Sequence, residues 1–571
     1  MDILQQLLKK GFFPIQLPPC FNSSSWAEKV QLINDNIEDV TNRKPNGYNP
    51  SKKWTKILKY SVARSSFHRR TTSILNPVSY FLLAKVIADN WDEINNHYQK
   101  SEISLSKPNL DSTGLRSINL TKFSALYDKK IIKSSGYKYA LITDINSYFP
   151  SIYTHSIPWA LDTKENAKKR IRENRWLANK LDLYCRNLQD GQTVGLPIGP
   201  DTSHIISEII GVSIDCLLKD ALNGWPNGFR YVDDFYLFFE TRVEAEKALA
   251  ALIRITGDFE LQINASKTKI IDSKELVEES WRYIIKKLKI SPEIKTQKND
   301  IHNFFSSTFN LENKFKDESI AKYALKQLSS SVIKKNNWEI FESYLLKFGF
   351  NFPNTIELIS RFLITYDHYD YNLNKKSIKT FCFNMLIEHS NSDHHNEVSW
   401  LLWLCKKLKI KIIKAVFEAI VNMNNDICNL LLLDMQHNKL LTPRTNFSQE
   451  MLEKYKNKDS LDNNSWLITY EAGRRLWLEN ESKEFITAHP IFNFFLENEI
   501  SFYETESALP LLFKKKENVT NDIFSTDSDI KHDLEFDELD EEYFDNVDEN
   551  PFEDESDEHY SSILIEDNDE F

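Results

Sequence analysis

The sequence predicts an α+β domain, followed by an all-α, solenoid-like helical region and a disordered acidic tail. Three observations carry this prediction. Apolar runs typical of strands alternate with helical segments between residues 137 and 271, apolar residues recur at helical spacing further along, and acidic residues dominate from residue 517 onward. Hydrophobic residues make up 41% of the 571 residues, which is enough for sizeable cores and excludes wholesale disorder.

Charge is divided unevenly along the chain. Residues 517–571 contain 23 acidic residues and one basic residue, Lys531, whereas the whole chain has a formal net charge of −12. Residues 1–516 therefore carry a net charge of +10, which predicts a polyanionic partner. The simplest interpretation of the tail is a solubilising, disordered extension. The alternative is that the acidic tail imitates a nucleic acid and occupies the basic channel of the protein when product is absent.

Composition shifts divide the chain into four predicted regions. These are an N-terminal extension (1–130), an α+β domain (131–290), a helical domain (291–516) and the tail (517–571). In the first region, Gly11–Pro14 and Leu17–Pro19 favour an extended path after a short helix, and a basic stretch follows between Lys52 and Arg70.

The second region is predicted to contain strands at 137–143, 229–239 and 267–271, with helices at 202–219 and 242–255. The third repeats apolar residues at helical spacing in 318–347, 354–366, 397–407 and 411–434.

The six cysteines are scattered without a metal-ligand or disulfide pattern, which predicts a reducing compartment. We see no signal peptide and no apolar run long enough to span a bilayer, so we expect a cytoplasmic protein without a membrane partner.

Three segments of the α+β domain carry candidate chemistry. A strand ends at Asp144, a Gly/Pro loop from Gly195 to Gly199 leads into a helix that Asp201 can cap, and the pair Asp233–Asp234 separates two apolar runs in the pattern of a hairpin. Neighbouring strands can bring these carboxylates together, where they repel one another unless cations neutralise them. Carboxylate oxygens suit Mg²⁺, and two such ions can support phosphoryl transfer.

The ordered set of motifs resembles the palm of reverse transcriptases. The matching segments are Asp144 with Tyr148–Phe149, Gly195–Gly199, Tyr231–Asp234 and Leu261–Thr268, with Arg69–Pro77 similar to the basic fingers segment. The sequences of three segments are similar to those of prokaryotic defence-associated and abortive-infection reverse transcriptases, the unknown-group branch. These segments are Gly11–Pro14, Pro150–Trp159 and Pro197–Ser203. The resemblance covers about residues 10–290 and implies a right-hand fingers–palm architecture before the helical domain.

The resemblance implies a role for each matching residue. Asp144, Asp233 and Asp234 are the expected Mg²⁺ ligands, and Lys267 is the expected proton donor to pyrophosphate. Phe149 is expected to exclude the 2′-hydroxyl of a ribonucleotide, and Arg69 and Arg70 are expected to hold the triphosphate. The residues expected to line the nucleotide pocket are Ile145, Gly195, Pro197, Ile198 and Gly199.

The implied activity is RNA-directed or template-independent DNA synthesis from dNTPs, acting in antiviral defence against bacteriophage. The implied partners are RNA and DNA product, with a noncoding RNA and further copies of the chain as additional candidates. Many templated reverse transcriptases have Gln where this chain has Ile198, and in this branch that departure accompanies unusual synthesis. Two alternatives stay open: a polymerase that makes RNA, which Phe149 disfavours, and a catalytically idle nucleic-acid-binding scaffold or phage sensor.

Simpler interpretations compete at several positions. Arg69–Arg70 fits an ordinary basic turn, and Tyr231, Phe235 and Tyr148 fit strand and core packing. His394 and His395 with Glu397 suggest a metal site, but a polar loop that enters a helix explains them more simply.

Overall fold

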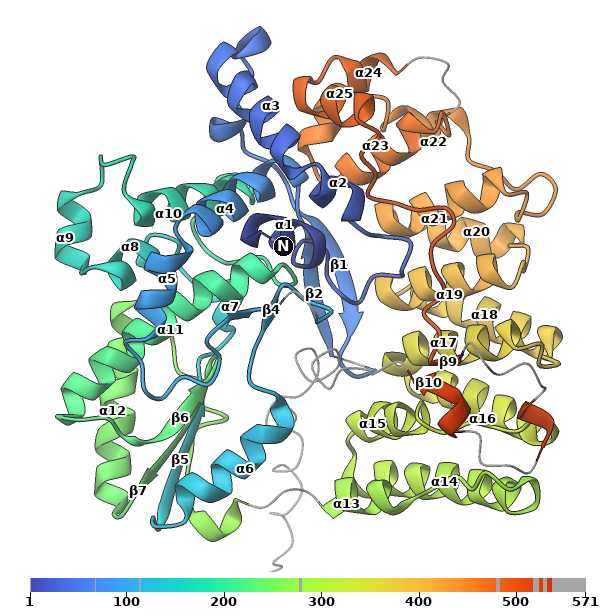
Figure 1. Cartoon of the computed structure of the whole chain (residues 1–571), viewed down its shortest axis with the longest axis horizontal. Helices are drawn as coiled ribbons and strands as arrows, with labels where there is room; N and C mark the ends of the chain where they lie inside the picture. The colour runs from blue at the N-terminus through green and yellow to red at the C-terminus, as the bar shows by residue number, and fades with distance from the viewer. Residues whose placement is uncertain are drawn as a thin grey trace, which may run out of the picture.

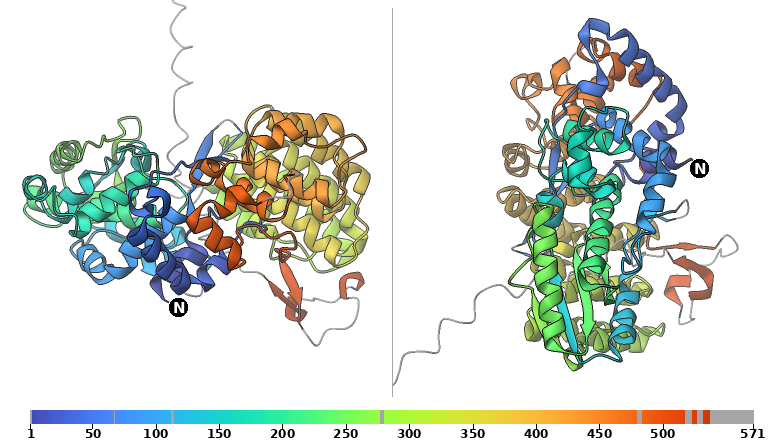
Figure 2. Two further views of the ribbon diagram at one scale, coloured as in Figure 1. Left: turned by 90° about the horizontal axis from the view of Figure 1, so that it is seen from above. Right: turned by 90° about the vertical axis from the view of Figure 1, so that its left-hand side faces the viewer.

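The computed structural model describes residues 2–66, 68–111, 114–276, 280–478, 483–516, 523–526 and 531–536. A sheet with its helices occupies one side of the molecule, a stack of helices occupies the other, and the N-terminal region joins them (Figure 1). The view from above in Figure 2 shows the same order, with the N-terminal region between the two bodies. None of the described helices has the length and apolar composition needed to cross a membrane.

The N-terminal region combines helices with a two-stranded antiparallel hairpin. Its elements are α1 (Ile3–Lys10), α2 (Ser24–Glu28), α3 (Val30–Arg43), β1 (Leu58–Ala63), β2 (Arg69–Ile74), α4 (Pro77–Asp89), α5 (Trp91–Tyr98), β3 (Asn109–Leu110) and β4 (Ile118–Asn119). Helix α4 begins where the Asn76 side chain accepts a hydrogen bond from the Val78 N–H, with Pro77 in the first turn. Almost every side chain of α4 is buried, so this helix forms the core of the region.

The α+β region is built on a four-stranded antiparallel sheet with the order β6–β7–β5–β8. Its elements are α6 (Phe123–Ser134), β5 (Tyr139–Asp144), α7 (Tyr148–Ser151), α8 (Ser156–Leu161), α9 (Lys164–Lys169), α10 (Leu177–Asn187), α11 (Asp201–Leu222), β6 (Asn227–Tyr231), β7 (Asp234–Phe239), α12 (Arg242–Asp258) and β8 (Lys269–Asp272).

Alternation along the strands places helices on both faces of this sheet. Leu141 and Leu237 belong to the main core, on the face covered by α12, whereas Ile142 and Tyr236 belong to a smaller core that includes Leu126 of α6. The sheet therefore has helices on both faces (Figure 1).

The helical region is a stack in which most helices pack on their neighbours one and two positions along the chain. Its helices are α13 (Ser280–Lys287), α14 (Ile294–Phe315), α15 (Ser319–Leu328), α16 (Trp338–Asn351), α17 (Ile356–His368), α18 (Lys375–Ser390), α19 (His395–Lys407), α20 (Lys414–Asn422), α21 (Asp426–His437), α22 (Gln449–Glu453), α23 (Trp466–Arg474), α24 (Glu484–Thr487) and α25 (Pro490–Glu497). Helix α13 lies within the range expected for the α+β domain but packs on α14 and α15.

The N-terminal region and the end of the helical stack share one aromatic core. The rings of Phe12, Trp26 and Phe502 lie with centroids 5.0 to 6.0 Å apart, and Trp466 of α23 packs on Phe502 at 5.1 Å. Segments that are more than 400 residues apart in the chain thus fold against each other.

Part of the predicted disordered tail is ordered, which corrects that expectation for residues 523–526 and 531–536. Strand β10 (Leu534–Phe536) pairs with β9 (Phe513–Lys515), and the Phe524 ring lies 4.9 Å from that of Tyr369. Apolar anchors between the acids supply the burial that ordering requires, because Phe524 and Leu534 are buried. Residues 537–571, which carry most of the predicted tail, lie outside the described residues.

Candidate active site

The three candidate carboxylates lie at one end of the sheet. Asp144 is the last residue of β5 and pairs directly with Asp234, the first residue of β7. Asp233 lies in the two-residue turn between β6 and β7, because Tyr231 pairs with Asp234 across that hairpin. The turn matches the hairpin predicted from the sequence, and it brings residues that are about 90 positions apart in the chain to the same sheet edge.

Backbone contacts fix the hairpin tip against the end of β5. The Ile145 N–H donates to the Asp233 carbonyl at 3.2 Å, and the Asn264 N–H donates to the Asp144 carbonyl at 2.9 Å. Val232 adopts a left-handed conformation with φ 54°, which a β-branched residue rarely adopts. The turn is therefore held in a strained shape by its surroundings.

Burial and mutual repulsion act on two of these carboxylates. Burial raises the pKa of Asp144 to about 6, and burial together with the negative charge of Asp144 raises the pKa of Asp233 to about 7. Asp144 is 3% exposed, and its Oδ1 atom has no hydrogen-bond partner among the described residues. An all-oxygen donor set with an unsatisfied buried carboxylate oxygen fits a divalent cation.

Lys267 forms an ion pair with Asp144. Its Nζ lies 3.2 Å from Asp144 Oδ2, and its side chain is 12% exposed. The segment that carries Lys267 is anchored to β5, because Ile263 bridges to Ile145 and the Asn146 N–H donates to the Gln262 carbonyl at 2.8 Å. The structure thus brings Lys267 to the sheet edge that carries Asp144, Asp233 and Asp234, which we call the carboxylate corner.

The Gly195–Gly199 loop connects this corner to the β1–β2 hairpin. The Leu196 N–H donates to the Phe149 carbonyl at 2.7 Å, and the Ser73 N–H of β2 donates to the Ile198 carbonyl at 2.7 Å. Gly199 has φ +119°, and a Cβ there would lie 3.0 Å from the Pro14 ring, so this position requires glycine. Pro197 is buried, whereas Ile198 is only partly buried.

Asp201 does not cap α11, which corrects the sequence-based expectation. Helix α11 begins at Asp201 itself, after Pro200, and the carboxylate instead binds Arg116 and the Ser117 N–H. An arginine about 85 positions upstream thus competes successfully for this acid, because a buried charge needs a paired cation more than a helix end needs a cap.

Phe149 lies on α7 beside a histidine that sequence reasoning missed. Its ring centroid is 5.0 Å from that of His204 and 5.7 Å from that of Tyr148. Burial lowers the pKa of His204 to about 4, so the imidazole is neutral at physiological pH. The Tyr148 hydroxyl donates to the Ser207 carbonyl at 2.7 Å, which agrees with its interpretation as a core residue.

Arg69 and Arg70 lie in β2 and have different surroundings. Successive residues of a strand project to opposite faces, so the two guanidinium groups diverge. Arg70 is close enough to Asp233 for their charges to interact, although burial lowers its pKa. Arg69 instead binds both oxygens of Glu397 in α19, with Nη2 to Oε2 at 2.8 Å.

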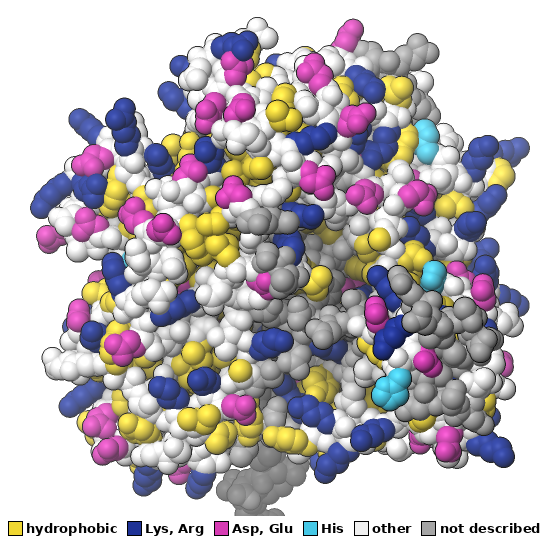
Figure 3. Space-filling view, in the orientation of Figure 1, with side chains coloured by type: hydrophobic (Ala, Val, Ile, Leu, Met, Phe, Trp, Pro, Cys, Tyr) yellow, Lys and Arg dark blue, Asp and Glu magenta, His cyan; other side chains and the backbone are white. Residues whose placement is uncertain are grey.

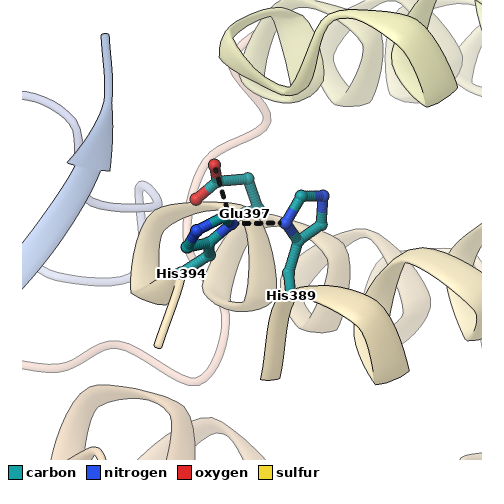
Figure 4. A group of neighbouring side chains, drawn as sticks. All are labelled: His389, His394 and Glu397. Atoms are coloured by element: carbon teal, nitrogen blue, oxygen red, sulfur yellow. Dashed lines mark hydrogen bonds and ion pairs between the residues drawn. The ribbon is translucent and has the colours of Figure 1, made fainter. Parts of the chain in front are cut away.

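Glu397 forms a cluster with His389 and the partly buried His394 (Figure 4). Their candidate ligand atoms lie within 4.8 Å of one another, and the two imidazole Nδ1 atoms are 2.7 Å apart. The carboxylate is already neutralised, since Arg69 holds the pKa of Glu397 low despite burial. The cluster therefore joins the β1–β2 hairpin to the helical stack with a cation from the chain itself.

Arg230 is the main supporting residue that sequence reasoning missed. It is fully buried and binds Glu208 and Asp215 of α11, each at 2.9 Å. Its Nη1 also donates to the Val232 carbonyl at 2.8 Å, which supports the turn that holds Asp233. A Cβ at Gly211 would lie 2.7 Å from the guanidinium, so α11 leaves space for it. The available signal was a charged residue in an apolar strand, together with acids and a glycine inside an apolar helix.

One part of the chain matches a known protein family. Residues 75–288 match the family model described as reverse transcriptase (RNA-dependent DNA polymerase). The match spans less than half of the chain and identifies this part as an RNA-directed DNA polymerase domain, a nucleotidyltransferase. It contains the three carboxylates, Lys267 and the Gly195–Gly199 loop, whereas Arg69 and Arg70 precede it.

Among solved structures, the chain is similar to telomerase from Candida albicans, which was solved in complex with the TWJ fragment of telomeric RNA. The sequence identity is 11% and the TM-score is 0.28. The aligned part covers 67% of this chain and 65% of that chain, so it spans slightly less than two thirds of the telomerase length. A comparison with curated proteins gives no match.

Proposed function

We propose that this chain is a DNA polymerase of the reverse-transcriptase type, which adds deoxynucleotides to a hydroxyl group and releases pyrophosphate. The observation that carries the proposal is the convergence of Asp144, Asp233 and Asp234 at one sheet edge, where two of the carboxylates have raised pKa values. Buried acids without full internal neutralisation are expected where a protein binds cations for catalysis.

Asp144, Asp233 and Asp234 would hold Mg²⁺ ions, with Asp144 and Asp233 as the main ligands. Two bound Mg²⁺ ions supply activation of the attacking hydroxyl and neutralisation of the leaving pyrophosphate. The chain itself fixes the acids before substrate arrives, through the Ile145–Asp233 backbone contact and the Arg230 network. This rigidity reduces the reorganisation needed during the reaction.

Cationic side chains around the carboxylates would handle the phosphates. Arg70 would contact the triphosphate, and its position in β2 within electrostatic range of Asp233 supports this role. Lys267, beside Asp144, would donate a proton to the departing pyrophosphate. Arg69 would reach a phosphate only after leaving Glu397, so we assign it a lesser part in substrate binding.

Phe149 would select the sugar, supported by His204 and lying beside the Gly195–Gly199 loop. Replacing the ring by a methyl group opens space where a 2′-hydroxyl would sit. We expect Phe149→Ala to incorporate ribonucleotides about tenfold better relative to deoxynucleotides, since a difference of one methylene-sized group in a pocket is worth roughly 10–200-fold. The measurement is the ratio of kcat/KM for dNTP and rNTP, and an unchanged ratio would remove Phe149 from this role.

The biological role that we propose is antiviral defence against bacteriophage in the cytoplasm. It is supported by the resemblance of Gly11–Pro14, Pro150–Trp159 and Pro197–Ser203 to defence-associated reverse transcriptases. The same resemblance supports synthesis that is either RNA-directed or template-independent, and a noncoding RNA or further copies of the chain as partners. Ile198 in place of the usual Gln supports the template-independent mode.

One incubation separates the polymerase from an idle scaffold. Purified chain is mixed with labelled dNTPs and Mg²⁺, with and without an added RNA template and primer. We expect label incorporation that is lost in the Asp233→Ala, Asp234→Ala double variant. Incorporation without template would identify template-independent synthesis, and label that stays on protein after denaturation would identify a protein hydroxyl as the primer. No incorporation under any of these conditions would contradict the proposal.

A further inference from the structure

Trp54 is a large apolar side chain left open to solvent in the N-terminal region. It precedes β1 and is 57% exposed. Its indole lies directly against Gly191, in the turn after α10, where a Cβ would be only 2.9 Å from the ring. Gly191 also has φ +77°, a conformation that favours glycine. The packing leaves the ring partly covered by the Gly191 backbone and partly accessible.

The backbone around Trp54 is fixed by hydrogen bonds to the same turn. The Thr55 N–H donates to the Asn187 carbonyl at 2.9 Å, and the Asp190 N–H donates to the Thr55 carbonyl at 2.8 Å. Thr55 is buried, and its hydroxyl bonds that of Ser79 in α4 at 3.0 Å. An exposed indole on such a rigid base loses little conformational entropy when it binds a partner.

Lysines surround this indole along the chain. The segment from residue 52 to 59 contains Lys52, Lys53, Lys56 and Lys59, of which all but Lys53 are exposed. Lys53 pairs with Asp462 at 3.2 Å, whereas Lys56 lies 3.7 Å from the exposed Asp190. Such a distant surface pair contributes little and leaves the lysine able to bind an anion. Figure 3 shows that Lys and Arg side chains are also spread over the face seen there.

We propose that Trp54 is a stacking platform for single-stranded nucleic acid, with Lys52 and Lys56 contacting the flanking phosphates. A flat aromatic surface binds any base, and the neighbouring positive charges attract a phosphate backbone, which is the combination that single-stranded nucleic-acid sites use. The turn at Gly191 precedes the Gly195–Gly199 loop in the chain, and the Gln189 amide donates to the Gly195 carbonyl at 2.7 Å, which connects this turn to the loop of the proposed nucleotide pocket. The inference rests on the proposed function, because the strand is the template or the product of that reaction.

The test is fluorescence anisotropy with fluorescein-labelled oligo(dT) and oligo(rU), using the full chain. We expect Trp54→Ala to weaken binding about tenfold, because stacking on one aromatic side chain has an effect of that order. Trp54→Phe keeps a ring and should stay within about threefold of the parent. Ile253→Ala in α12 is the matched control, since Ile253 is 53% exposed and should leave affinity unchanged.

Salt dependence separates stacking from charge. In the Lys52→Ala, Lys56→Ala variant, the slope of log Kd against log salt should fall by about two, while Trp54→Ala should keep the parent slope. Parent-like affinity in Trp54→Ala overturns the proposal. If Trp54→Ala instead sediments as a smaller species than the parent and keeps the parent affinity for the oligonucleotides, this surface is an interface between copies of the chain and the proposal is overturned.

The binding measurement is repeated in an Asp233→Asn background, which separates this inference from the proposed polymerase activity. If the parent chain incorporates no nucleotide but Trp54→Ala still weakens oligonucleotide binding, the proposed polymerase activity is wrong and the stacking role of Trp54 is supported. If incorporation occurs and Trp54 has no effect on binding, the platform alone fails.

Discussion

Buried acids in this molecule occur in two kinds of surroundings. Glu208 and Asp215 share the Arg230 guanidinium, and Glu397 binds Arg69, so each has a cation supplied by the chain. At the sheet edge, burial raises the pKa of Asp144, and burial together with the charge of Asp144 raises the pKa of Asp233, although Lys267 Nζ lies 3.2 Å from Asp144 Oδ2. The difference lies in geometry: a guanidinium holds Glu208, Asp215 and Glu397, whereas the buried Asp144 Oδ1 has no hydrogen-bond partner among the described residues and can accept an external cation.

Asp144→Asn is expected to have the largest effect on activity. Removing one of the main cation ligands should reduce dNTP incorporation by about a thousandfold, a loss similar to that of a principal electrostatic stabiliser. Stability should change little, because the change removes the repulsion with Asp233 together with the ion pair to Lys267. Incorporation rates and chemical unfolding of the same preparation test both statements. If Asp144→Asn loses activity only because it unfolds, Asp144 supports the fold as Glu208 and Asp215 do, and the difference between the two kinds of buried acid is contradicted.

Arg230→Met is expected to have the opposite pattern. Two buried carboxylates lose their shared partner, which should lower the free energy of unfolding by about 3–5 kcal/mol. Urea unfolding followed by circular dichroism measures this change. The triple variant that also carries Glu208→Gln and Asp215→Leu should recover part of the loss, since no unpaired charge stays buried. Equal stability of Arg230→Met and the parent would show that the pairing contributes nothing.

Glu397→Gln should have a smaller effect at the junction of the β1–β2 hairpin and the helical stack. The amide still accepts one hydrogen bond from Arg69 but no longer neutralises it, which should cost about 1–3 kcal/mol. Arg69 has partners in Ser61 that remain, with Nε to Oγ at 2.9 Å, and this limits the loss. Thermal unfolding provides the measurement. Arg69→Lys is the matched variant, because it keeps the charge but not the bidentate geometry.

The dependence of stability on pH should differ between the two kinds of acid. Asp144 and Asp233 have pKa values of about 6 and about 7 in the folded chain, above the ordinary value of 3.8, so the folded state holds these protons more tightly. With a chelator present, their contribution to stability should therefore rise as pH falls from about 8 to about 4. Glu397 has a lowered pKa, so its contribution is lost at low pH.

The measurement is urea unfolding of the parent and of the Asp144→Asn, Asp233→Asn double variant at each pH. The difference in unfolding free energy between the two chains should shrink toward low pH, because protonation relieves the repulsion in the parent. A difference that grows toward low pH would contradict the assigned direction of the pKa shifts.

The hairpin tip that carries Asp233 and Asp234 was predictable from sequence, because apolar strands flank these acids and the pairing of β6 with β7 is local. The position of Asp144 at the same sheet edge depends on the long-range pairing of β5 with β7, which local pattern alone does not determine. The divergence of Arg69 and Arg70 was not predictable, since it depends on the register of β1 with β2 and on where α19 lies. The ion pairs of Arg230 were equally unpredictable, because no sequence spacing connects Arg230 to Glu208 and Asp215 on α11.

The tail shows the same limit in another form. Its composition predicts disorder, and composition cannot reveal that Phe524 finds the Tyr369 ring, or that Leu534–Phe536 adds a strand to Phe513–Lys515. A few apolar residues spaced among acids are enough to order short segments when a docking surface is available.

The central claim is that the Asp144 and Asp233–Asp234 corner binds divalent cations, and Mn²⁺ titration followed by electron paramagnetic resonance tests it most directly. The parent chain should bind Mn²⁺ with saturation, Mg²⁺ should compete, and the Asp144→Asn, Asp233→Asn double variant should lose this binding while remaining folded. Equal Mn²⁺ binding by the parent and the double variant would contradict the account.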